Sequence, residues 1–144
     1  METKFNFNSA ICTSKAQSER LLALGLKKET ADMVHSTIVG LDNLVDLISE
    51  HPWTARQEVT DDWYPAWSLH RLIEMMPDTI AIENATCMGH RFFYLLTFMR
   101  DFVTYEVNSS VFKEFAEHDN YYDNIIDCIE WLIKEGYFNK EYLV

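Results

Sequence analysis

Apolar residues in the first half of the chain recur at helical spacing. They predict short helices over residues 14–24, 30–35 and 41–49. Ser14 and Gln17 have the spacing of a capping box, in which each side chain accepts a hydrogen bond from a backbone amide at the helix start. Gly25 stands where a left-handed residue ends a helix. The first of the three helices is therefore marked at both ends.

Two further helices are predicted downstream. Ser68 caps one that runs to Met76, where Pro77 stops it. Asn120 caps the last helix, and Gly136 ends it. One face of this last helix carries apolar residues at positions 125, 126, 129, 132 and 133. It is the clearest amphipathic element of the chain.

The stretch between these helices favours antiparallel strands. Residues 103–107 alternate apolar and polar, which predicts a strand, whereas Arg91–Met99 fits both a strand and a helix. We interpret these segments as two strands that meet near Arg100 and Asp101. Further strands are expected over Thr79–Glu83 and Val111–Phe115. The expected fold is α+β, a small antiparallel sheet packed by several short helices and a C-terminal amphipathic helix.

Length and charge narrow the class of protein. The 144 residues predict a single globular domain over 1–144, and 23 acidic against 12 basic residues give a net charge of −11. Residues 101–144 hold ten of the acids and three of the basic residues. The negative electrostatic field of such a chain repels nucleic acid and anionic membranes and favours a basic protein partner. No apolar run is long enough for a membrane span.

Cysteine usage and the chain start predict a compartment. Cys12, Cys87 and Cys128 are few, odd in number and far apart, unlike a disulfide scaffold. Met1–Ala10 lacks the apolar core of a signal peptide. We therefore expect a soluble cytoplasmic protein with free thiols.

Several segments together resemble a known group of proteins. They are Ser18–Leu26, Thr30–Met33, Pro65–Leu69 leading to Met76–Pro77, and Asp127–Gly136. The series is similar to small uncharacterised proteins carried by gut anaerobic bacteria and their phages and mobile elements, over most of the chain and through loose motifs. Members tend to carry Cys before the Pro-Ala-Trp-Ser stretch, where this chain has Tyr64. The resemblance implies an α+β fold and an accessory role, and it supplies no catalytic residues.

No complete catalytic or metal-binding motif is present. The four glycines never cluster, which excludes a phosphate-binding loop, and Ser68 lacks the flanking glycines of a nucleophile elbow. Cys87 and His90 form only one close ligand pair, whereas structural zinc uses two. His70 and Glu74, four residues apart, fit a surface ion pair. We expect neither metal nor cofactor.

The last helix carries the first candidate interaction site. Asp123, Asp127 and Glu130 form a stripe opposite the isoleucine face, and we expect it to be solvated. Trp131 also lies on the polar side. Two alternatives stay open for it: packing under another element, or an exposed anchor for a partner.

An aromatic segment over residues 51–70 carries the second candidate. It contains, within a predicted loop over 51–67, the residues Trp53, Trp63, Tyr64, Trp67, Asp61 and Asp62. These aromatics fit a stack against a sugar, a base or a proline, or a satellite core beneath the loop. The acids between them are the better catalytic candidates.

Two functions from different classes follow. The first is a non-enzymatic accessory or adaptor protein, encoded by a mobile element or phage, that binds another protein through an acidic, aromatic-bearing surface. The alternative is a small-ligand-binding protein or an unrecognised enzyme that uses the aromatic segment 51–70. The sequence does not decide the oligomeric state.

Overall fold

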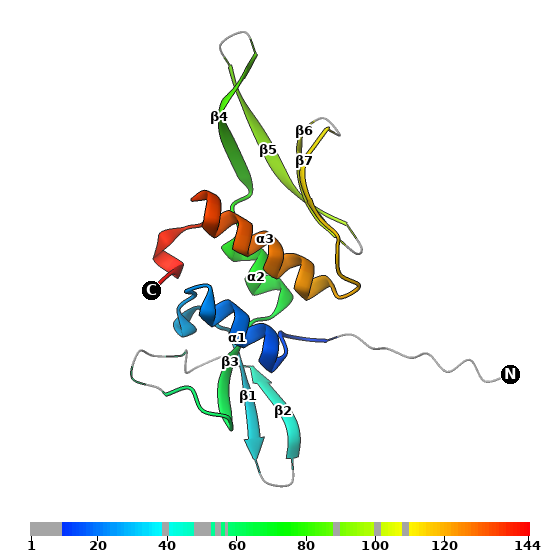
Figure 1. Ribbon diagram of the computed structural model, residues 1–144. Coiled ribbons are helices and arrows are strands. Elements are labelled where there is room, and N and C mark those ends of the chain that lie inside the picture. Colours follow the sequence, from blue (N-terminus) through cyan, green and yellow to red (C-terminus); the bar gives the residue numbers. More distant parts are fainter. Residues whose placement is uncertain are drawn as a thin grey trace, which may run out of the picture.

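In the part of the chain that the structure describes, three helices lie between two antiparallel sheets (Figure 1). The computed structural model describes residues 10–38, 41–47, 53, 56, 58–87, 90–99, 102–107 and 110–144. The helices are α1 (Lys15–Ala23), α2 (Leu69–Met75) and α3 (Tyr121–Glu135), with 3-10 turns η1 (Lys28–Thr30) and η2 (Lys140–Tyr142). The strands are β1 (Met33–Ile38), β2 (Leu41–Leu47), β3 (Trp63–Ala66), β4 (Thr79–Cys87), β5 (His90–Phe98), β6 (Val103–Val107) and β7 (Ser110–Phe115). The expected α+β class is confirmed, with two antiparallel sheets.

Local signals set the helix ends as predicted. The capping box at Ser14 and Gln17 forms, and Gly25 takes a φ of 99°. The Leu26 amide then donates to the Leu21 carbonyl oxygen at 3.2 Å, which completes a Schellman ending. Gly136 ends α3 in the same way, with a φ of 78°. Because a left-handed backbone strains any residue with a Cβ, both glycines are conformationally required.

The three-stranded sheet corrects three sequence predictions. Its order is β2-β1-β3, so the helices predicted over 30–35 and 41–49 are wrong, and part of the predicted loop, Trp63–Ala66, is a strand. Val34 pairs with Asp46 on one side and Pro65 on the other. Pairing on both sides satisfies the backbone of β1 more fully than a single helical turn would.

The four-stranded sheet has the order β4-β5-β6-β7. It settles Arg91–Met99 as a strand for all but its last residue, and it confirms the strands expected over 79–83, 103–107 and 111–115. Arg100 and Asp101 lie outside the described residues, but the Met99 amide donates to the Phe102 carbonyl oxygen at 2.9 Å where β5 turns into β6.

The main core lies where α3 meets the other helices and the sheet. The buried face of α3 includes Ile125, Ile126, Ile129 and Leu132, each fully shielded from solvent. The same cluster contains side chains from all three helices and from β4, β6 and β7. Tyr105 of β6 is buried in it, and its hydroxyl donates to the Pro77 carbonyl oxygen at 2.8 Å. This packing fixes α3 against the sheet and so positions the site described next.

Candidate functional site

Trp131 sits in an aromatic cluster between α3 and the sheet. Its ring centroid lies 5.6–6.1 Å from four other rings, those of Tyr105, Phe112, Phe115 and Tyr137. At this spacing tilted rings attract one another beyond simple burial. Of the two alternatives for Trp131, the structure therefore shows packing under another element. The side chain stays half-buried, so part of it is open to solvent.

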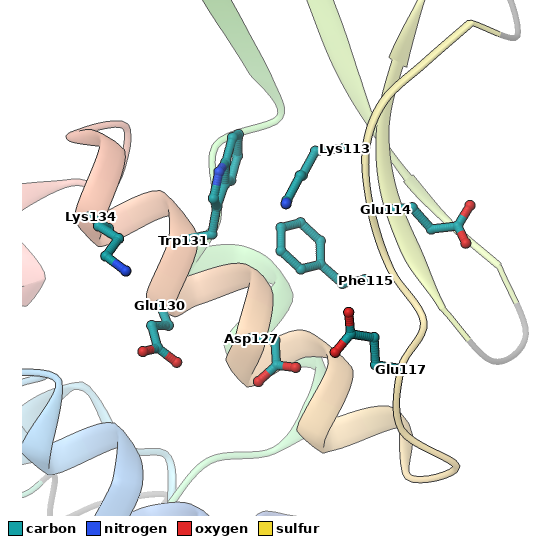
Figure 2. A pocket seen from close by; sticks show the side chains of 8 residues that line it. All are labelled: Lys113, Glu114, Phe115, Glu117, Asp127, Glu130, Trp131 and Lys134. Atoms are coloured by element: carbon teal, nitrogen blue, oxygen red, sulfur yellow. The ribbon is translucent and has the colours of Figure 1, made fainter.

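Trp131 also lines a groove between β7 and α3 (Figure 2). This β7–α3 groove has a volume of about 220 Å³ and is lined by Lys113, Glu114, Phe115, Glu117, Asp127, Glu130, Trp131 and Lys134. Its lining includes no residue of β6, and β7 is the edge strand of its sheet. The groove therefore opens beside the sheet edge rather than beneath the sheet.

The rim of the β7–α3 groove carries an excess of acid. Four carboxylates stand against two ammonium groups among its lining residues. Lys113 Nζ lies 5.7 Å from the centre of the Phe115 ring, a cation–π distance. Glu117 points toward Asp127 in Figure 2, whereas Glu114 points away from Trp131. The groove thus combines two aromatic side chains with a mostly acidic lining.

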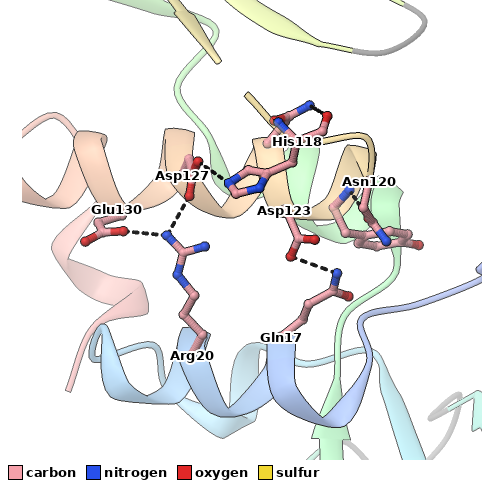
Figure 3. A network of polar contacts seen from close by, with 9 residues as sticks. Gln17, Arg20, His118, Asn120, Asp123, Asp127 and Glu130 are labelled. Atoms are coloured by element: carbon pink, nitrogen blue, oxygen red, sulfur yellow. Dashed lines mark hydrogen bonds and ion pairs between the residues drawn. The ribbon is translucent and has the colours of Figure 1, made fainter. Parts of the chain in front are cut away.

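The acidic stripe of α3 is tied to α1 (Figure 3). Arg20 uses one nitrogen, Nη2, to contact both Asp127 Oδ1 and Glu130 Oε2 at 2.6 Å. One turn earlier on α1, Gln17 Nε2 donates to Asp123 Oδ1 at 3.0 Å. Burial disfavours the charge on Arg20, but its hydrogen bonds to the two carboxylates prevail and raise its pKa.

This arrangement corrects the expectation of a solvated stripe. The Asp127 side chain is only 25% exposed, and its second oxygen lies 2.8 Å from His118 Nε2. His118 lies in the loop that precedes α3. Its backbone is fixed by Asn124, whose side chain accepts from the His118 amide at 2.8 Å and donates to the His118 carbonyl oxygen at 2.9 Å. Helix periodicity places residues on a face, but it does not reveal which distant element covers that face.

A cysteine and a histidine meet elsewhere, a pair that sequence reasoning missed. Cys12 Sγ lies 3.6 Å from His35 Nε2, and the same nitrogen lies 2.6 Å from the Thr13 carbonyl oxygen. A carbonyl oxygen can only accept, so Nε2 carries the proton and is not free to take one from the thiol. Burial and then Asp32 raise the pKa of Cys12 to about 11. The pair therefore lacks the thiolate that nucleophilic catalysis needs.

Ser68 is a helix cap, as predicted. Its hydroxyl accepts from the Arg71 amide at 3.1 Å and donates to Asp32 Oδ2, and Asp32 Oδ1 accepts from the Ser68 amide at 2.8 Å. With the hydroxyl held in this way, Ser68 stabilises the start of α2.

The aromatic segment does not assemble as one ligand site. Trp53 and Trp67 are buried, and the Trp67 indole donates to Thr30 Oγ1 at 2.9 Å. Trp63 is 41% exposed. Asp62 is also exposed. Both buried tryptophans belong to the main core rather than to a separate satellite core beneath the loop.

Only Tyr64 and Asp61 of this set line a second cavity, of about 270 Å³. Lys15 reaches across it to Asp61 at 2.7 Å and lies 5.5 Å from the Tyr64 ring centre. Hydrogen bonding to Lys15 lowers the pKa of Asp61. Tyr64 itself stacks on His35 with ring centroids 4.7 Å apart. A solvent-exposed ion pair between Lys15 and Asp61 therefore lies at this cavity.

Metal-binding groups do not gather in the described part of the chain. Within it, no cluster of three or more histidine, cysteine or acidic side chains has the geometry to hold an ion. The side chains of Cys87 and His90 lie outside the described residues. His70 and Glu74 form the expected ion pair, at 3.1 Å.

Among the described residues, no helix has both the length and the apolar character needed to cross a bilayer. Comparison with known proteins assigns the chain to no family. The resemblance to small proteins of gut anaerobes and their phages therefore stays a prediction. No family model, curated protein or solved structure matches the chain.

Proposed function

We propose that the protein is a non-enzymatic adaptor that binds another, basic protein through the β7–α3 groove. The observation that carries this proposal is the groove itself, which is lined by Trp131 and Phe115 and by four carboxylates against two ammonium groups. Two of these carboxylates, those of Asp127 and Glu130, also pair with Arg20. Tryptophan anchors surrounded by charged rims are common where proteins bind one another.

The charge of the whole chain supports a basic partner. The net charge is −11, and the groove lies in the region that holds ten acidic and three basic residues. Such a field steers a positive surface toward the groove and speeds association, an effect that added salt weakens. Three of the four residues expected from sequence to carry the interaction, Asp127, Glu130 and Trp131, line the groove, and Asp123 does not.

The test uses a rim charge that does not hold the fold together. Glu117 is exposed and lines the groove, so Glu117→Lys reverses its charge with little effect on folding. Immobilised wild-type and variant protein are incubated with lysate of the native source, and retained proteins are identified by mass spectrometry. We expect a basic protein that wild type retains and Glu117→Lys loses.

Glu135→Lys is the matched control, because Glu135 is exposed on α3 but does not line the groove. It changes net charge equally and should retain the same protein. The retained protein is then purified, and its association rate should fall with salt and with Glu117→Lys. Equal retention by both variants would contradict the proposal.

A second candidate, small-ligand binding, is favoured by the cavity beside Tyr64 and Asp61. A ligand that binds only the folded state raises the melting temperature. A thermal-shift screen with nucleotides and sugars therefore tests it, and a flat response counts against it. We further propose the cytoplasm as the compartment, because Cys12 and Cys128 are free thiols. An accessory role for a phage or mobile element rests on the sequence resemblance alone.

A further inference from the structure

Among the described residues, the four-stranded sheet exposes several large apolar side chains on the face that points away from the helices. The side chains along β5 alternate between the two faces of the sheet. Those of Tyr94, Leu96 and Phe98 pack against the core. Phe93 and Leu95 are each 55% exposed, and Met99 is 50% exposed. Because successive residues of a strand point to opposite faces, these three share the outer face of the sheet.

The apolar face extends across the sheet. Leu95 is in register with Thr79 on β4 and with Glu106 on β6, and Glu106 is in register with Val111 on β7. Val111 is 48% exposed. The exposed parts of these four large apolar side chains amount to roughly 400 Å² in total, with Glu106 placed between Leu95 and Val111.

The segment that contributes most of this face carries no net charge. Residues 79–99 hold one acidic residue, Glu83, and one basic residue, Arg91, in a chain of net charge −11. Two copies of so acidic a chain repel each other over most of their surface, and this segment is where that repulsion is weakest. A basic partner, in contrast, gains most at the acidic groove.

The remaining charges around the face suit a two-fold arrangement. Arg91 lies near the start of β5. Toward the other end of β5, Thr97 is in register with Thr104, and Thr104 with Glu114, which is exposed. If two β5 strands cross in antiparallel directions, the Arg91 end of one copy faces the Glu114 end of the other. Such opposite charges fix the orientation of an interface.

We propose that this outer face is the contact between two copies of the chain. The two sheets stack face to face at the roughly 10 Å spacing of packed sheets, with the side chains of Phe93 and Leu95 interdigitated. The interface is isologous, since the same patch is used on both copies. The apolar side chains supply about half of the roughly 800 Å² per partner that a standard interface buries, and polar neighbours would supply the rest. The proposal shares Glu114 with the lining of the β7–α3 groove but does not depend on a partner bound in that groove.

The test is the mass of the full chain in solution, measured by light scattering after size exclusion over about 1 to 100 µM. We expect a species of twice the 17.0 kDa chain mass. Leu95→Lys places a charge on an exposed position, so the variant should fold, as checked by circular dichroism. It should raise the dimer dissociation constant at least about tenfold.

Ile11→Lys is the control, because Ile11 is 61% exposed and lies outside both sheets. It should leave the dimer intact. A wild type that stays monomeric over the whole range would overturn the proposal, even if Leu95 then proved to bind a different protein. A dimer that survives Leu95→Lys and Phe93→Lys would overturn it too.

Discussion

Removing the Arg20 side chain tests whether α1 holds the acidic stripe of α3. Arg20→Ala breaks two ion pairs at once, each 2.6 Å long, with Asp127 and Glu130. The Arg20 side chain is 36% exposed, and those of the two acids are 25% and 45% exposed. Pairs this accessible contribute about 0.2–1 kcal/mol each. The variant also leaves the acids of α3 to repel one another.

We therefore expect Arg20→Ala to lower the free energy of unfolding by about 1–2 kcal/mol, or roughly 2–8 °C in melting temperature. Urea unfolding followed by tryptophan fluorescence measures this, because Trp53 and Trp67 are buried in the folded state. In about 1 M salt, where charges are screened within about 3 Å, the loss should shrink.

Lys140→Ala is the control. Lys140 is exposed in η2, so this substitution removes the same charge at a position away from the α1–α3 contact. It should change stability by less than about 0.5 kcal/mol. A double-mutant cycle with Asp127→Ala should give a coupling of about 0.5–1 kcal/mol. If Arg20→Ala matched Lys140→Ala, or if its effect did not depend on salt, the argument for this contact would be refuted.

Three further predictions concern residues that are buried or that have a strained backbone. Asn124→Ala should cost about 2–3 kcal/mol in chemical unfolding, because the fully buried amide satisfies both backbone groups of His118; a loss below about 0.5 kcal/mol would contradict this. Gly136→Ala should cost about 1 kcal/mol from its φ of 78°, since a Cβ there meets no neighbouring atom. The Cys12 thiol has a pKa raised from 9.0 to about 11, so stability should be full below pH 9 and fall as pH rises toward 11. Cys12→Ala should make that alkaline decline shallower, although burial also raises the pKa of Cys128, which keeps part of the decline, and an unchanged slope would assign it to other groups.

The helix ends that the sequence predicted correctly depend on residues that are neighbours in the chain. The caps at Ser14 and Ser68 and the ending at Gly136 each depend on contacts within one turn of a helix, so spacing alone reveals them. The helices predicted over 30–35 and 41–49 failed because the pairing of β1 depends on β3, a segment far along the chain. Short apolar runs fit both periods, and only the distant partner decides between them.

In the candidate site, too, local sequence predicts some features, whereas others depend on segments far along the chain. The helical wheel placed Asp127 and Trp131 away from the isoleucine face correctly, yet it predicted solvent where α1 lies. A second, aromatic contact surrounds Trp131 because α3 packs against helices on one side and against β6 and β7 on another. The β7–α3 groove and the uncovered face of β5 both arise from this tertiary packing, and no motif in the sequence marks them.

The central claim, that the β7–α3 groove receives a basic protein, is tested most directly by crosslinking in cells of the native source. A photoreactive amino acid replaces Lys134, which lines the groove, or Lys140, which is equally exposed but outside it. The account predicts one crosslinked basic protein from position 134 and none from position 140. The same products from both positions, or a crosslinked partner of net negative charge, would contradict it.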